Sequence, residues 1–172
     1  MIARLPKGAV AIYRGFGAPD ALLHARRLAW IARRRGVRLL IGADPDLARR
    51  SGAGGVHLPE RLAHLAGRLT RAHPGWLVSV AAHSLPAARR AARLGAQAVL
   101  VSAVFPSRSP SARAPLGPLR FEALARRTPA PVIALGGVNA RTATRLAHGR
   151  ASGLAAIEGL IEQQNSARRG KP

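Results

Sequence analysis

Short apolar runs alternate along the chain with longer segments in which apolar and polar residues are mixed. The runs fall at residues 9–13, 37–41, 55–58, 76–80, 98–101, 131–135 and 153–157. Polar residues do not alternate with apolar ones inside them, which is typical of strands buried on both faces of a parallel sheet. The pattern therefore predicts seven short strands.

The segments between the runs predict helices. Residues 19–35 hold a set of side chains at helical spacing, namely Leu22, Leu23, Arg26, Arg27 and Trp30. Pro19 suits a first turn, Ser84 is a candidate N-cap for a helix that Gly95 stops, and Asn139 and Gly149 delimit another helix in the same way. Strands that alternate with helices predict right-handed crossovers and an α/β fold.

The composition is that of a globular protein. Of the 172 residues, 48% are hydrophobic and 20% are charged, which suits one domain with a sizeable core. No apolar run approaches the roughly 20 residues that span a bilayer, and the first residues do not resemble a secretory signal. We therefore expect a cytoplasmic protein without a membrane partner. The absence of cysteine excludes disulfides and thiolate chemistry.

The charge is strongly positive. Lys and Arg number 28 against 7 for Asp and Glu, a formal charge of +21, and such a field attracts anions, including nucleic acid. The arginines, however, are spread as doublets that fit the outer faces of several helices. Only 3% of residues are aromatic, which leaves few rings for stacking unpaired bases. These features argue against a dedicated nucleic-acid binder, although a polyanion binder remains an alternative.

Two loops that follow predicted strands suit a phosphate. Gly136 and Gly137 would let backbone amides point at an anion, and a helix starting near Asn139 would add its positive end. The loop after residues 98–101 combines hydroxyl and guanidinium groups in Ser107, Arg108 and Ser109. A plain turn and a mobile proline-rich surface loop are the respective alternatives.

Three other polar side chains stand near strand ends. Arg14 directly follows an apolar run, where it could contact an anion or form a salt bridge at the rim. His57 and His83 do not have the local spacing of a metal pair. We expect His57 to be a packed, hydrogen-bonded histidine.

Several motifs, in this order, resemble the thiamine phosphate synthase and TenI family of small (β/α)₈ barrels. "AIYRGF" corresponds to the family's Gln-x-Arg-x-Lys strand end, and "LLIGADPDLARRSGAGGVHLPE" to its Asn-Asp strand followed by Gly-Val-His-Leu-Gly-Gln. "SVAAHSLPAARRAARLGAQAVLVSAVFPSRSP" resembles its Ser-x-His segment and hydroxyl loop. "PVIALGGVN" and "ASGLAAI" resemble its last phosphate-binding strands, so the resemblance runs from about residue 9 to residue 161.

The resemblance implies a TIM (β/α)₈-type barrel that begins at the family's second strand and so lacks the first βα unit. We expect a single barrel domain over residues 1–162 and a polar, flexible tail over 163–172. Seven strands would leave unpaired edges, which must be covered. Either the true start lies upstream, or the N-terminal segment, a distorted closure or a partner such as a second copy of the chain covers the gap.

The family's reaction joins a hydroxymethylpyrimidine diphosphate to a thiazole phosphate and expels pyrophosphate, with Mg²⁺ and basic groups stabilising the departing diphosphate. The resemblance places Arg14 and His83 among the catalytic positions. It places the phosphate-binding positions at Gly136, Gly137, Ser107, Arg108, Ser109, Ile157 and Glu158. Glu158 stands where a serine is usual, and its charge would repel phosphate unless it turns away.

The diphosphate side departs from the family pattern. Gly42 and Ala43 replace the Asn-Asp pair, and Leu62 stands near the second metal-binding Asp. The other replacements are Ile12, Phe16, Ala81 and Pro110, together with Ala103 at the position of the TenI histidine. Asp44 and Asp46 remain nearby, but in the register of the family's structural residues. We assign no metal ligands, and expect Mg²⁺ as a cofactor only if synthase activity survives.

Three hypotheses follow. The first is a thiamine phosphate synthase/TenI-like protein that binds a phosphorylated thiazole-type ligand, with impaired magnesium–diphosphate chemistry. The second is an active synthase, a transferase in which Asp44 and arginines substitute for the missing groups. The third is a non-catalytic binder of polyanions or nucleic acid.

Overall fold

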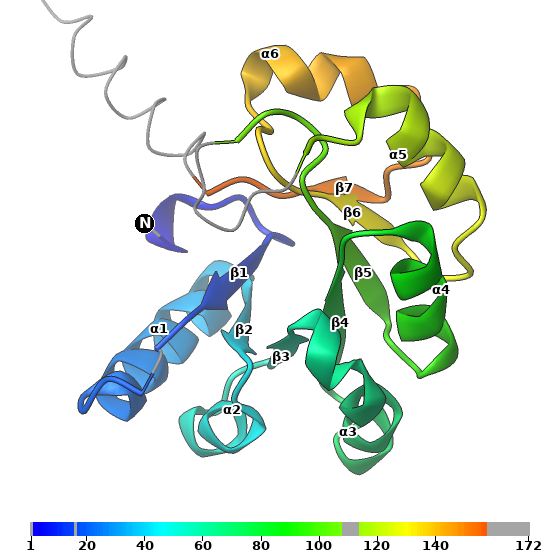
Figure 1. Cartoon of the computed structure of the whole chain (residues 1–172). Helices are drawn as coiled ribbons and strands as arrows, with labels where there is room; N and C mark the ends of the chain where they lie inside the picture. The colour runs from blue at the N-terminus through cyan, green and yellow to red at the C-terminus, as the bar shows by residue number, and fades with distance from the viewer. Residues whose placement is uncertain (1, 16, 108–113, 158–172) are drawn as a thin grey trace, which may run out of the picture. The chain divides into compact units, whose positions relative to one another are not determined.

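The computed structural model describes residues 2–15, 17–107 and 114–157 (Figure 1). They form seven parallel strands that alternate with helices, and the strand order follows the chain from β1 to β7. This confirms the predicted α/β fold class. The predicted tail at 163–172 lies outside the described residues. The chain divides into two compact units, an N-terminal unit (Met1–Val80 with Leu94–Gln97) and a C-terminal unit (Ala81–Arg93 with Ala98–Pro172).

The N-terminal unit is built on strands β1 to β4. Its elements are η1 (Ile2–Arg4), β1 (Val10–Tyr13), α1 (Ala21–Arg35), β2 (Arg38–Gly42), α2 (Pro45–Ser51), β3 (Gly55–Leu58), η2 (Glu60–Leu65), α3 (Ala66–Ala72) and β4 (Leu77–Ala82, whose last two residues belong to the C-terminal unit). The register pairs Val10 with Arg38, Gly42 with His57, and His57 with Ser79. The carboxyl ends of β1, β2 and β3 therefore lie next to one another.

The C-terminal unit repeats the same alternation. It contains α4 (Leu85–Arg93), β5 (Ala98–Val101), α5 (Gly117–Arg126), β6 (Val132–Ala134), α6 (Ala140–Ala143), η3 (Thr144–Leu146) and β7 (Gly153–Leu154). Strand β6 pairs with β5 through Val101 and Ala134, and with β7 through Ala134 and Leu154. The predicted helix over 139–149 is thus one α-turn followed by a 3₁₀ turn.

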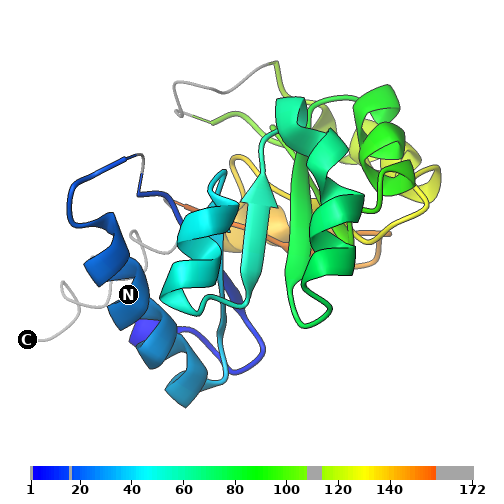
Figure 2. The ribbon, with the colours of Figure 1, turned by 90° about the horizontal axis from the view of Figure 1, so that it is seen from below.

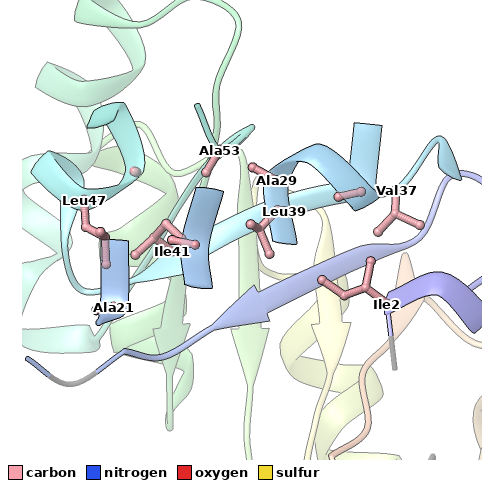
Figure 3. Packing of buried hydrophobic residues seen from close by; sticks show 11 residues of the cluster. Ile2, Ala21, Ala29, Val37, Leu39, Ile41, Leu47 and Ala53 are labelled. Carbon is pink, nitrogen blue, oxygen red and sulfur yellow. The ribbon is translucent and has the colours of Figure 1, made fainter. Parts of the chain in front are cut away.

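The core of the N-terminal unit depends on small residues. Four alanines of α1 are buried, Ala21, Ala25, Ala29 and Ala32, and the short side chains bring the helix close to β2. Figure 3 shows Ala21 and Ala29 near Leu39 and Ile41. Leu23 and Trp30, whose spacing predicts this helix, lie on its exposed side instead, with 69% and 56% of their surfaces accessible.

Helix ends follow the expected chemistry. Ser84 Oγ accepts a hydrogen bond from Ala87 N at 3.3 Å, and Asn139 Oδ1 accepts from Thr142 N at 3.0 Å, so both predicted N-caps are confirmed. Gly95, with φ of 93°, follows α4 as predicted. The arginine doublets 26–27, 49–50, 89–90 and 126–127 and the triplet 33–35 are all exposed, which confirms their place on outer faces.

The strands differ in burial. Every residue of β3 and β5 is buried, as predicted for strands covered on both faces, whereas β1 is only partly buried. Ile2 of η1 packs into the core that Val37 and Leu39 help to form (Figure 3). In the described part of the chain, no helix is long and apolar enough to cross a membrane.

A substitution at Gly55 tests how closely β3 packs against β4. Its φ is 147°, and a Cβ there would collide with the backbone of Leu77. We expect Gly55→Ala to lower the free energy of unfolding by more than about 2 kcal/mol, measured by denaturant titration. Gly75→Ala is the control, because a Cβ on Gly75 meets nothing within 4 Å. Equal stability of the two variants would contradict this packing.

Candidate functional site

In the N-terminal unit, the strand ends bring together Arg14, Gly42 and His57. Arg14 follows β1, and its side chain passes so close to Gly42 that a Cβ there would lie 2.9 Å from Arg14 Cγ. A larger residue at position 42 would therefore displace the stem of Arg14. Position 42, where the family resemblance places an asparagine, therefore has no side chain that would block Arg14. Arg14 is exposed at this edge.

His57 is buried, with 4% of its surface accessible, and its Nδ1 lies 3.0 Å from the Oγ of Ser79 on β4. Burial, and secondarily the charge of Arg14, lower the pKa of His57 to about 4. The imidazole is therefore neutral near pH 7, and it acts as a hydrogen-bonded core residue. The prediction of a packed histidine is confirmed.

The backbone after β2 has an unusual conformation at Ala43. Its φ is 62°, in the left-handed region that Asn and Asp adopt more readily than alanine. Ala43 N donates to His57 O at 2.8 Å, which holds the turn against β3. The family resemblance places an aspartate at this position, so the chain keeps a backbone suited to that residue without its carboxylate.

The two nearby carboxylates are bonded to helix α2. Asp44 Oδ1 accepts from Leu47 N at 2.8 Å and so caps the helix. Asp46 lies 2.8 Å from Arg49 and 3.6 Å from Arg50, and chiefly the hydrogen bond from Arg49 lowers its pKa. These bonds, with Gly42 and Ala43 in place of oxygen ligands, do not fit a Mg²⁺ site. Within the described ranges, no group of three or more His, Asp or Glu residues could hold a metal ion.

In the C-terminal unit, His83 follows β4 and Ser102 follows β5. His83 Nδ1 lies 2.9 Å from the backbone oxygen of Ser102 and 3.3 Å from its Oγ. A carbonyl oxygen can only accept a hydrogen bond, so Nδ1 carries the proton, and Nε2 is the basic nitrogen of the neutral ring. Ser102 therefore fixes both the tautomer and the orientation of His83.

The glycine pair follows β6 and lies against the loop that follows β5. Gly136 and Gly137 have φ of 89° and 64°. A Cβ on Gly136 would lie 2.8 Å from Ala103 Cα, and one on Gly137 would collide with the backbone oxygen of Pro106. Phe105 N also donates to Gly136 O at 3.0 Å. The pair is thus required by the close approach of the two loops, and this contact brings the start of the hydroxyl loop beside it.

The turn after the glycine pair is organised by its own side chains. Thr142 Oγ1 donates to Gly137 O at 2.9 Å and accepts from Asn139 N at 2.9 Å. Asn139 Oδ1 in turn accepts hydrogen bonds from the backbone amides of Arg141 and Thr142. The expected contribution of the helix start to anion binding is therefore reduced, since α6 is a single turn and these two donors already have partners.

The predicted phosphate-binding residues are described only in part. Ser107 is half-buried and has a bonding partner, and Ile157 follows β7 with 61% of its surface exposed. Arg108, Ser109 and Glu158 lie outside the described residues. Sequence reasoning did not identify Ser79. Its signal was a single hydroxyl within the apolar run "WLVSV", which the register places beside His57.

Comparison with known proteins identifies the family of the chain. The family model described as Thiamine monophosphate synthase (TMP-TENI) matches residues 9–160. The chain belongs to this family. It is 32% identical over 169 residues to the thiamine-phosphate synthase of Chromobacterium violaceum, a match that covers 96% of this chain and 81% of the relative. It is 36% identical over 148 residues to that of Bordetella avium, covering 82% and 68%.

A solved structure shows the same fold. The thiamine phosphate pyrophosphorylase from Pyrococcus furiosus superposes with a TM-score of 0.77 at 21% identity, covering 91% of this chain and 75% of that one. The family resemblance seen in the sequence is therefore confirmed, together with the TIM-barrel type of the fold.

The buried neutral histidine predicts a stability that depends on pH. The unfolded chain binds a proton at His57 below about pH 6.5, whereas the folded chain does so only below about pH 4. We therefore expect His57 to lower the free energy of unfolding by roughly 3 kcal/mol as the pH falls from 7 to 4. In His57→Gln, this part of the loss should be absent.

Urea titrations at several pH values measure this difference. His64→Gln is the control, because His64 is exposed and its replacement should leave the pH profile of the parent chain unchanged. A His57→Gln profile parallel to that of the parent between pH 7 and pH 4 would contradict the assignment of a buried neutral imidazole.

Proposed function

We propose that the chain binds a phosphorylated thiazole-type ligand in the thiamine biosynthetic family, and that the magnesium-assisted departure of diphosphate is impaired. Two separate observations support it: in the C-terminal unit the glycine pair after β6 contacts the loop after β5, and in the N-terminal unit the carboxylates of Asp44 and Asp46 are bonded within and to α2. On this proposal the phosphate side of the family's chemistry survives in part, and its metal side is altered.

The phosphate would bind in the C-terminal unit. Gly136 and Gly137 place no side chain of their own over the backbone amides of this turn, and backbone amides in a turn can bind an anion. Ser107 would add a hydroxyl donor from the adjacent loop, and Arg108 and Ser109 continue that loop in the sequence. Ile157 and Glu158 would complete the contacts through their backbone.

Arg14 and His83 are the proposed catalytic residues. Arg14 carries an exposed, permanently charged guanidinium that could hold a diphosphate. His83 has a fixed tautomer with the proton on Nδ1, so its Nε2 could accept a proton from a bound ligand. Neither role needs a metal ion, and neither replaces the charge that Mg²⁺ supplies to the departing diphosphate in this family.

Active synthesis of thiamine phosphate is the second candidate function. It is favoured by the 32% identity to a thiamine-phosphate synthase over 96% of the chain and by the retention of Arg14. Against it, an arginine can neutralise a diphosphate but cannot act as a ligand of Mg²⁺. The two functions differ in turnover and not in recognition of the thiazole phosphate.

Calorimetry tests the binding of the ligand. We expect thiazole phosphate to bind and the unphosphorylated thiazole alcohol to bind much more weakly, because the proposed contacts are to phosphate. Ser107→Ala should weaken binding by about tenfold, the effect of losing one hydrogen bond to a charged group. Ser152→Ala is the matched control in the same unit, because this exposed serine precedes β7 instead of following a strand. An absence of heat and of thermal stabilisation at millimolar ligand would remove the proposal.

A turnover assay separates the two functions. With both substrates and increasing Mg²⁺, we expect no release of pyrophosphate above the uncatalysed rate, because Asp44 and Asp46 are bonded to α2. A pyrimidine substrate that is radiolabelled in its diphosphate makes even slow release of pyrophosphate detectable. Pyrophosphate release that rises with Mg²⁺ would instead establish the active synthase.

A further inference from the structure

Helix α1 carries an exposed tryptophan surrounded by arginines. On an α-helix, the neighbours of Trp30 on the same face lie three and four residues before and after it. All four of these positions are arginine, namely Arg26, Arg27, Arg33 and Arg34. We call these five residues the Trp30 surface. Trp30 is 56% exposed, and each of the four arginines is exposed.

This surface is not explained by packing within the N-terminal unit. It lies opposite the alanine stripe with which α1 contacts the core, so removal of the indole would leave that contact intact. The second tryptophan, Trp76, is different, because it is half-buried and stacks on His73 with ring centroids 3.9 Å apart. An exposed indole is unusual in a chain with only 3% aromatic residues.

Two of the four arginines are held in place by hydrogen bonds, and none of the four forms an ion pair with a carboxylate of the described residues. Arg26 Nε donates to Arg50 O at 3.3 Å, and Arg33 donates to Gly52 O at 2.9 Å, so both are anchored at the C-terminal end of α2. Each uses one of its five N–H groups in that bond. Helices α1 and α2 lie side by side (Figure 2). The nearby carboxylates are engaged elsewhere, Asp20 with His24 and Asp46 with arginines of α2. The surface therefore has donors and positive charge to offer.

The spacing suits a chain of phosphates with a base between them. Arg26 and Arg27 are one pair, and Arg33 and Arg34 are a second pair seven residues later, about 10 Å along the helix axis. Trp30 lies between the two pairs. The guanidinium of Arg34 already stacks over the indole, 4.9 Å from its centroid, so the ring is presented as a stacking platform.

We propose that the Trp30 surface binds single-stranded nucleic acid, with a base stacked on Trp30 and the flanking phosphates bound by the arginine pairs. Stacking on an aromatic side chain next to a positively charged track is the general way in which proteins bind single strands without sequence preference. This inference is independent of the proposed thiazole-phosphate site, which lies in the C-terminal unit.

An anionic membrane is the main competing occupant. It would also attract arginines, but it favours a helix with a broad apolar face that enters the acyl region. Here, Leu23 and Trp30 are the two large apolar side chains exposed on α1, and Arg34 covers part of the indole. The observations thus favour a partner that offers a ring and phosphates over one that offers an acyl layer.

Tryptophan emission and fluorescence anisotropy test the proposal on the full chain. A labelled oligothymidylate should quench Trp30, with Trp76 as the internal reference, and Trp30→Ala should weaken binding about fivefold to a hundredfold. Four phosphate contacts predict a log–log salt slope of about −3. Inorganic polyphosphate, which has charge without bases, should bind more weakly than the oligonucleotide and leave the emission unchanged.

Two charge-matched variants separate a local surface from general attraction. Arg27→Gln/Arg34→Gln removes two charges beside Trp30 and spares the arginines bonded to α2, whereas Arg89→Gln/Arg90→Gln removes two exposed charges from α4. We expect the first pair to weaken binding at least tenfold more than the second. Equal effects of the two pairs, unchanged binding of Trp30→Ala, or binding of phosphatidylserine vesicles in place of the oligonucleotide would each overturn the proposal.

Discussion

The close approach of the glycine pair after β6 to the loop after β5 is the constraint on which the proposed phosphate site in the C-terminal unit depends. Side chains at positions 136 and 137 would collide with Ala103 and with the backbone of Pro106, so the two loops can approach only because both residues are glycine. Neither glycine places a side chain of its own beside the start of the hydroxyl loop. The packing role of these glycines is therefore compatible with the proposed phosphate site.

At the strand ends of the N-terminal unit, an arginine lies beside residues that carry no oxygen ligands. His57 is buried against Ser79, and Ala43 has a left-handed backbone that suits an aspartate. Arg14 passes over Gly42, where the family resemblance places an asparagine. Asp44 and Asp46 hold helix α2 and its arginines. Positive charge is thus present at this edge without the carboxylates that would bind a divalent cation, and this imbalance motivates the proposed loss of magnesium chemistry.

The fold followed from the sequence because strands and helix ends leave local signals. Apolar runs predicted all seven strands of the described residues to within three residues at either end, and Ser84 and Asn139 predicted helix starts. The buried face of α1 was not apparent, because alanines give a weak periodic signal beside the larger Leu23 and Trp30. Non-local geometry was equally out of reach, since the bond between His57 and Ser79 depends on the register of two strands. Sequence motifs identified Gly136 and Gly137 as candidates. The collisions that a Cβ at either position would make with Ala103 or Pro106 are visible only in three dimensions.

The central claim is that the glycine pair and the adjacent loop receive a phosphate ester. Nuclear magnetic resonance of the ¹⁵N-labelled chain, titrated with thiazole phosphate, tests it most directly, because amide shifts report contacts residue by residue. The account predicts saturable shifts at the amides of Gly136, Gly137 and Ser107, and much smaller ones with the unphosphorylated thiazole. Unchanged chemical shifts at these three amides, together with changed shifts at other amides, would contradict it.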